Sequence, residues 1–133
     1  MKQLILALVL TLIMSTTAIA DEYILIFNHY RETNEWKTAL AITNFSALPN
    51  NIKIAVYQPK GGLFDTRDML FDGYPAMEQQ IDTLYNLISR PGLPEHGALI
   101  LKGEYAFAAT LFMENIETGG FAAIEKIATF VAD

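Results

Sequence analysis

Two histidines are the side chains in this sequence best suited to metal binding or general-base catalysis. His29 and His96 each lie in a polar segment, and neither belongs to an H-E-x-x-H motif or another close two-histidine spacing. A folded pairing of both histidines with Glu95 is one way to build a metal site, but the chain has no cysteine to join them. We therefore interpret both as surface histidines and expect no metal.

The tightest acidic group is Asp65, Asp68 and Asp72 in the segment DTRDMLFD. On a strand, Asp65 and Asp68 face opposite sides, which argues against a shared cation. The spacing of a calcium-binding EF-hand loop is absent. We expect these carboxylates to be solvated or paired with Arg67.

Activated nucleophiles are also lacking. Ser46 and Ser89 lie in segments expected to be loops, and neither belongs to a G-x-S-x-G motif. The glycine pairs at 61–62 and 119–120 are typical of turns rather than of phosphate-binding loops. The sequence therefore predicts no catalytic residue, no cofactor and no enzymatic activity.

Aromatic side chains offer the better prospect of a binding surface, because exposed rings stack on sugars or anchor protein partners. Tyr57 lies on the strand face opposite Ile52, Ile54 and Val56 and should point outward. Core or boundary packing is the explanation we favour for most aromatic residues, and Trp36 should point inward. The candidate binding residues are Tyr57, Tyr74 and Tyr30.

The N-terminus has the pattern of a secretory signal peptide. A lysine precedes an apolar stretch of about a dozen residues, and Ala18-Ile19-Ala20 forms an A-x-A cleavage site. The apolar stretch is shorter than the about 20 residues of a membrane-spanning helix. We expect residues 1–20 to be removed, and a periplasmic or secreted mature chain, 21–133, without a membrane span.

Composition excludes several classes of function. The formal net charge is −6 and there is no basic cluster, which disfavours binding to nucleic acid. Without cysteine there is no disulfide framework, thiol nucleophile or thiolate metal site. The mature chain has the length of a single domain.

The elements that must position these side chains are mostly strands. Apolar and polar residues alternate in two segments, 36–44 and 52–57, as in strands with one buried face. The stretch 35–62 thus looks like two strands of one antiparallel sheet. Further strands are expected at 23–27, 63–71, 98–102, 105–113 and 121–131, with 98–102 and 105–113 forming a hairpin across Gly103-Glu104.

Helical patterns are few. Residues 76–89 have helical character: Thr83 can cap a helical turn near 83–89, and Leu84, Leu87 and Ile88 share one helical face. Residues 121–131 fit a helix or a last strand, and we favour the strand. About seven strands with one short helical turn predict an all-β fold, a single antiparallel β-sandwich.

The spacing of Trp36, Thr38, Leu40, Ile42 and Asn44, followed by strands, a Leu-rich helical turn at 84–88 and a closing hairpin, resembles a known class of module. These are small immunoglobulin-like sandwich modules of exported bacterial proteins, often of unassigned function. The resemblance covers about residues 22–124. It implies that Trp36 belongs to the sheet and Asn44 to the turn after it, and it brings no catalytic residue.

The sequence therefore predicts a non-catalytic exported module. Its expected partner is another envelope or secreted protein, or a second copy of the chain. The segment YILIF at 23–27 is unusually apolar for an edge strand, so it is either covered within the fold or paired with a partner chain. The alternative function is binding of a carbohydrate or envelope polymer through exposed tyrosines.

Overall fold

The computed structural model describes residues 22–73 and 77–132. The predicted signal peptide and Tyr74 lie outside these ranges. The described residues form strands and a short helix in this order: β1 (Glu22–Arg31), β2 (Trp36–Asn44), β3 (Asn50–Tyr57), β4 (Leu63–Phe71), β5 (Gln79–Thr83), α2 (Leu84–Ile88), β6 (His96–Gly103), β7 (Phe107–Asn115), β8 (Phe121–Ile127) and β9 (Thr129–Val131).

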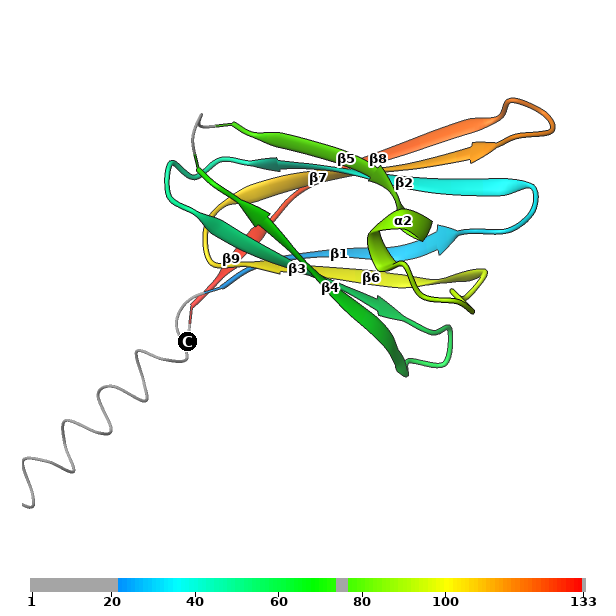
Figure 1. The fold of residues 1–133 in the computed structure, drawn as a ribbon, viewed down its shortest axis with the longest axis horizontal. Coiled ribbons are helices and arrows are strands. Elements are labelled where there is room, and N and C mark those ends of the chain that lie inside the picture. Colours follow the sequence, from blue (N-terminus) through cyan, green and yellow to red (C-terminus); the bar gives the residue numbers. More distant parts are fainter. Residues whose placement is uncertain (1–21, 74–76, 133) are drawn as a thin grey trace, which may run out of the picture.

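The strands form two antiparallel sheets that face each other (Figure 1). One sheet has five strands in the order β4-β3-β6-β1-β9, and the other has four in the order β5-β2-β7-β8. The predicted all-β antiparallel sandwich is confirmed. β4 has the predicted bounds, and it pairs with β3 across the turn at 58–62 as expected.

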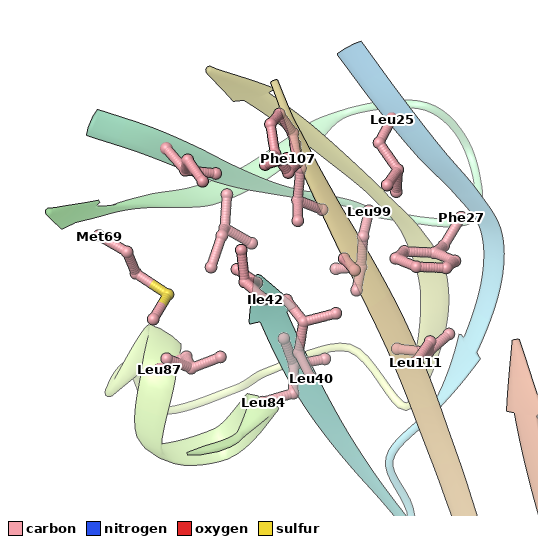
Figure 2. Packing of buried hydrophobic residues seen from close by; sticks show 14 of the residues in the cluster. Leu25, Phe27, Leu40, Ile42, Met69, Leu84, Leu87, Leu99, Phe107 and Leu111 are labelled. Carbon is pink, nitrogen blue, oxygen red and sulfur yellow. The ribbon is translucent and has the colours of Figure 1, made fainter. Parts of the chain in front are cut away.

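The core lies between the sheets and follows the alternation of the sequence. In β2, Leu40 and Ile42 are buried, and in β3 Ile52, Ile54 and Val56 are fully buried. Figure 2 shows Leu40 and Ile42 among inward side chains of the other strands, and the core includes Leu25, Phe27, Leu99, Phe107 and Leu111. The period-2 pattern therefore identified the buried faces correctly.

Two predicted strand pairings are wrong. β2 and β3 belong to different sheets, and so do β6 and β7, so neither pair forms a hairpin. Both connections cross from one sheet to the other beside Asn50, which is fully buried. The Asn50 amide donates to Asn44 Oδ1 (3.0 Å) and to the carbonyl of Tyr105 (3.2 Å), and its Oδ1 accepts from the N–H of Glu104 (3.2 Å). Buried side-chain hydrogen bonds thus replace the ladder bonds of a hairpin.

Residues 22–73 and 77–132 form nine strands rather than about seven, for two reasons. Residues 79–83, expected to be helical, form β5 along the edge of β2. The last predicted strand is interrupted at Ala128, which is buried and donates its N–H to the carbonyl of Phe107 (2.9 Å). There the chain passes from the four-stranded sheet to the five-stranded one.

The sandwich has two lateral seams, and α2 closes one of them. Thr83 caps α2 as predicted by accepting from the N–H of Asn86. Leu84 and Leu87 point into the core between β2 and β4 (Figure 2). No helix within residues 22–73 and 77–132 is long and apolar enough to span a membrane. The opposite seam, between β1 and β8, has no such helix over it in the described chain.

Candidate functional site

The structure describes two of the three candidate tyrosines, Tyr30 and Tyr57. Tyr30 is fully buried, and its hydroxyl donates to the carbonyl of Pro94 (2.9 Å). Burial, and to a smaller extent the negative charge of Glu32, raises the pKa of Tyr30 to about 12. Tyr30 is therefore a core residue and not part of an exposed platform, which corrects the expectation from the sequence. Tyr57 is half-buried at the end of β3, and Tyr74 lies outside the described residues.

Gly97 explains how the ring of Tyr30 fits inside. It lies opposite Tyr30 in the β1–β6 ladder. A Cβ atom at position 97 would lie 2.1 Å from the carbonyl oxygen of Tyr57 and 3.2 Å from Cε1 of Tyr30. Glycine is therefore required for the close approach of β3 and of the Tyr30 ring to β6.

Next to Tyr30, a cleft of about 420 Å³ opens at one end of the sandwich. We call it the end cleft, and it is lined by His29, Arg31, Thr33, Glu35, Trp36, Glu95 and His96. Trp36 is half-buried, because it lies at the start of β2, where the inward face of the strand reaches the end of the sandwich. The guanidinium carbon of Arg31 lies 5.6 Å from the centre of the Trp36 ring. An indole beside groups that donate and accept hydrogen bonds can bind a polar ligand that has a flat apolar face.

Glu32 fixes the β1–β2 turn that forms one wall of the end cleft. Its carboxylate accepts from the N–H of Thr38 (2.7 Å) and lies 3.6 Å from Lys37 Nζ. Its own N–H donates to the carbonyl of Glu95 (2.7 Å), on the opposite wall. In the turn, Thr33 Oγ1 accepts from the N–H of Trp36 (3.0 Å). These bonds hold both walls of the end cleft in place.

The end cleft brings together the two histidines. β1 pairs with β6 so that Arg31 lies opposite His96, and the ring centroids of His29 and His96 are 6.1 Å apart. Both rings are exposed, as predicted, and Arg31 Nε donates to His29 Nε2 (3.4 Å). Within the described ranges, no group of three or more His, Cys, Asp or Glu side chains could hold a metal ion.

A second hollow, which we call the β1 groove, follows the open seam. Its first part is about 430 Å³ and its second about 200 Å³, and His29 joins the second part to the end cleft. The β1 groove is lined by Ile24, Leu25, Ile26, Phe27, Asn28, His29, Met113, Ile124, Lys126, Ile127, Thr129 and Val131.

The β1 groove exists because β1 is covered unequally. On one side β6 pairs with β1 along most of its length, from Tyr23 to Arg31. On the other side β9 pairs only with Glu22 to Ile24, and no other strand of the described chain pairs with β1 there. Ile124, on the inward face of β8, consequently remains 39% exposed, and Ile26, on the outer face of β1, is 43% exposed.

Lys126 bridges the open seam. It lies on the inward side of β8, opposite Ala109, and its ammonium donates to the carbonyl of Ile26 (2.7 Å). The same ammonium lies 5.9 Å from the ring centre of Phe27. An inward-pointing charged residue beside an unpaired edge is a recognised way to discourage unwanted strand pairing.

Sequence reasoning identified the apolar segment at 23–27 but neither hollow. The end cleft combines β1, the β1–β2 turn and the start of β6, which are distant in sequence. For the end cleft, the signal in the sequence is the possible pairing of His29 and His96 with Glu95. For the β1 groove, the signal was the lysine in FAAIEKI, which interrupts an otherwise apolar strand face.

These features define an all-β antiparallel sandwich with a polar cleft at one end and an apolar groove along one seam. No protein-family model matches the chain, and no curated protein matches it at a significant level. Among solved structures, the crystal structure of Thermotoga maritima 1070 is similar, with a TM-score of 0.58 and 12% sequence identity. The match covers 83% of this chain and 95% of that one. At this identity the likeness shows the fold alone.

Proposed function

We propose that this protein is a non-catalytic, exported module of the immunoglobulin-like sandwich type that binds another protein in the cell envelope or outside the cell. The observation that carries the proposal is the edge of β1, which from Leu25 to Arg31 has no strand partner on one side among the described residues and has an apolar groove beside it. Such an edge accepts an added strand through backbone hydrogen bonds, while the groove accepts side chains. Export is supported by the signal-peptide pattern of residues 1–20.

A non-catalytic role fits the exposure of the end cleft. The side chains of His29, His96, Glu35 and Glu95 are all exposed. Catalytic acids and bases are commonly found where burial and neighbouring charges shift their pKa values. Exposed groups around an indole are better suited to binding than to proton transfer.

Export is tested by mass spectrometry of the protein recovered from the native host. We expect a mature chain that begins at Asp21, found outside the cytoplasm. A full-length chain retained in the cytoplasm would contradict the exported part of the proposal.

Partner binding is tested by cross-linking and pull-down of the tagged protein, expressed with its own signal in its native host. We expect a near-stoichiometric partner that is lost when Ile26→Lys places a charge on the open edge. Ile81→Lys is the matched control, because Ile81 is an exposed isoleucine on β5, in the other sheet. Retention of the partner by Ile26→Lys would exclude the edge of β1 as the binding site.

The second candidate function is binding of a carbohydrate or envelope polymer, and the end cleft is the observation that favours it. Trp36 offers a ring face, and the carboxylate of Glu35 can accept from sugar hydroxyls. The chain has one tryptophan, so its fluorescence reports on the end cleft. Saturable changes on titration with a panel of oligosaccharides, abolished by Glu35→Ala and retained in Glu104→Ala, would favour this function. No change across the panel would count against it.

A further inference from the structure

The β1 groove has a chemical character that narrows the choice of partner. We propose that its occupant is an extended segment of another protein, with apolar side chains at alternate positions and a carboxylate facing Lys126, added as a strand on β1. This inference deepens the proposed function and rests on it.

The backbone of β1 supplies the first element of recognition. The carbonyl of Ile26 points into the open seam, where it accepts from Lys126 Nζ. In a strand the N–H of a residue points to the same side as its carbonyl, so Ile26 offers both groups to an added strand. An incoming backbone N–H would take the place of the lysine ammonium on this carbonyl. The displaced ammonium then needs a new acceptor.

Apolar side chains supply the second element. Between β1 and β8 the groove reaches Phe27, Met113 and Ile124, at the border of the core. Side chains of an added strand point alternately toward the core and away from it. Those pointing inward would cover Ile124 and the core at this seam, just as α2 covers the core at the opposite seam. From Leu25 to Arg31 the edge has room for a segment of about seven residues, roughly 23 Å long.

Charge supplies the third element. The chain has 15 acidic and 9 basic residues, yet none of the described acidic residues lines the β1 groove. Lys126 and His29 line it, and Arg31 follows where the groove meets the end cleft. The β1 groove is therefore basic, whereas the molecule as a whole is acidic. A carboxylate on the added strand would become the new acceptor for Lys126 in a partly desolvated seam.

A second copy of the chain fits this groove less well. A twofold axis through the edge would bring the same basic side chains of both copies together. The outer edge of β4, which could pair with β1 head to tail, is already occupied. Its carbonyls at Phe64 and Leu70 accept from the side chains of Arg90 and Gln80. At the β1 edge, Lys126 is more easily displaced from the carbonyl of Ile26, because a carboxylate on the added strand can accept the hydrogen bond of its ammonium instead.

The test uses nine-residue peptides, blocked at both ends, that alternate valine and threonine and carry aspartate, asparagine or lysine at the centre. Each is titrated into the ¹⁵N-labelled mature protein, and amide shifts are followed by NMR. We expect saturable shifts confined to β1 and β8, with the aspartate peptide binding about tenfold more tightly than the lysine peptide. In Lys126→Glu we expect the order to reverse. Lys60→Glu, the same charge change in an exposed turn, should keep the wild-type order.

Each other outcome overturns the inference. Equal affinity for the three peptides would contradict the role of the carboxylate. Amide shifts outside β1 and β8, or no shifts at millimolar peptide, would exclude the β1 groove as a strand-binding site. Concentration-dependent dimerisation by sedimentation, with broadening of the same amides, would assign the groove to a second copy. Failure of this inference can be distinguished from failure of the proposed function. Loss of the cellular partner in Ile26→Lys without an aspartate preference leaves the proposed function standing, whereas retention of that partner excludes the β1 edge, and with it both this inference and the observation that carries the proposed function.

Discussion

Gly97→Ala gives a sharp test of the packing behind the end cleft. The added methyl group would lie 2.1 Å from the carbonyl oxygen of Tyr57, which belongs to the backbone of β3. Tyr57 pairs with Ala98 at the end of the β3–β6 ladder, so this oxygen cannot rotate away as a side chain does. Relief of the clash requires the end of β3 to move from β6 by roughly 1 Å, because a carbon–oxygen contact needs at least about 3 Å.

The expected cost follows from that displacement. Inserting a methyl group into a well-packed core costs about 1–3 kcal/mol. The upper half of this range applies, since backbone must move and the Tyr30 ring is a further obstacle at 3.2 Å. For a domain of this size, 1 kcal/mol corresponds to roughly 4 °C in Tm. We therefore expect Gly97→Ala to lower Tm by about 8–12 °C.

Urea and thermal unfolding followed by circular dichroism measure the effect. Gly62→Ala is the matched control, because its nearest neighbour would be the flexible side chain of Gln58 at 4.0 Å. The control should remain within about 0.5 kcal/mol of the wild type. A Gly97→Ala variant as stable as the control would refute the close approach of β3 to β6, and with it the burial of Tyr30.

Three further variants test other buried contacts. The first variant is Tyr30→Phe. In the wild type, a folded-state pKa of Tyr30 above the ordinary value of 10 stabilises the fold at lower pH, and this contribution disappears as the pH rises toward 12. The loss of stability between pH 10 and 12, measured by urea unfolding at stepped pH, should therefore be about 2 kcal/mol smaller in Tyr30→Phe than in the wild type. Asn50→Ala leaves the N–H groups of Glu104 and Tyr105 without their acceptor and should cost about 2–4 kcal/mol in thermal unfolding; an effect below about 0.5 kcal/mol would contradict the role of Asn50 at the crossovers. Glu32→Gln removes a negative charge near Tyr30 and should lower the pKa of Tyr30 in a spectrophotometric titration, whereas an unchanged titration would show that burial alone sets it.

Local structure was predictable where nearest neighbours in the sequence decide it. β4 and the capped turn of α2 came out as expected, because alternation and a threonine cap act within a few residues. The pairing of strands was not predictable in the same way. A glycine after 98–102 is typical of a hairpin turn, but at Gly103 a Cβ would meet the ring of Phe107 at 3.1 Å, so this glycine serves a crossover instead.

The candidate sites were harder to predict than the strands. Tyr30 lies within a polar segment, 28–34, and local sequence gave no sign that β1 continues past a bulge and buries its ring. The end cleft depends on the register that sets Arg31 opposite His96, which long-range pairing determines. The β1 groove depends on how far β9 extends, and that length is decided at Ala128, where the chain changes sheets.

The position of β1 in its sheet also bears on how the chain folds. Its ladder partners are β6 and β9, so β1 cannot form its backbone hydrogen bonds before these later strands are available. Pairing between such distant segments is slow, because loop closure precedes any gain in contacts. A chain that is synthesised or exported from its N-terminus thus carries an apolar, unpaired β1 at least until β6 has emerged. We expect such a chain to depend on a holding chaperone during this interval, with the sandwich assembling in one late step.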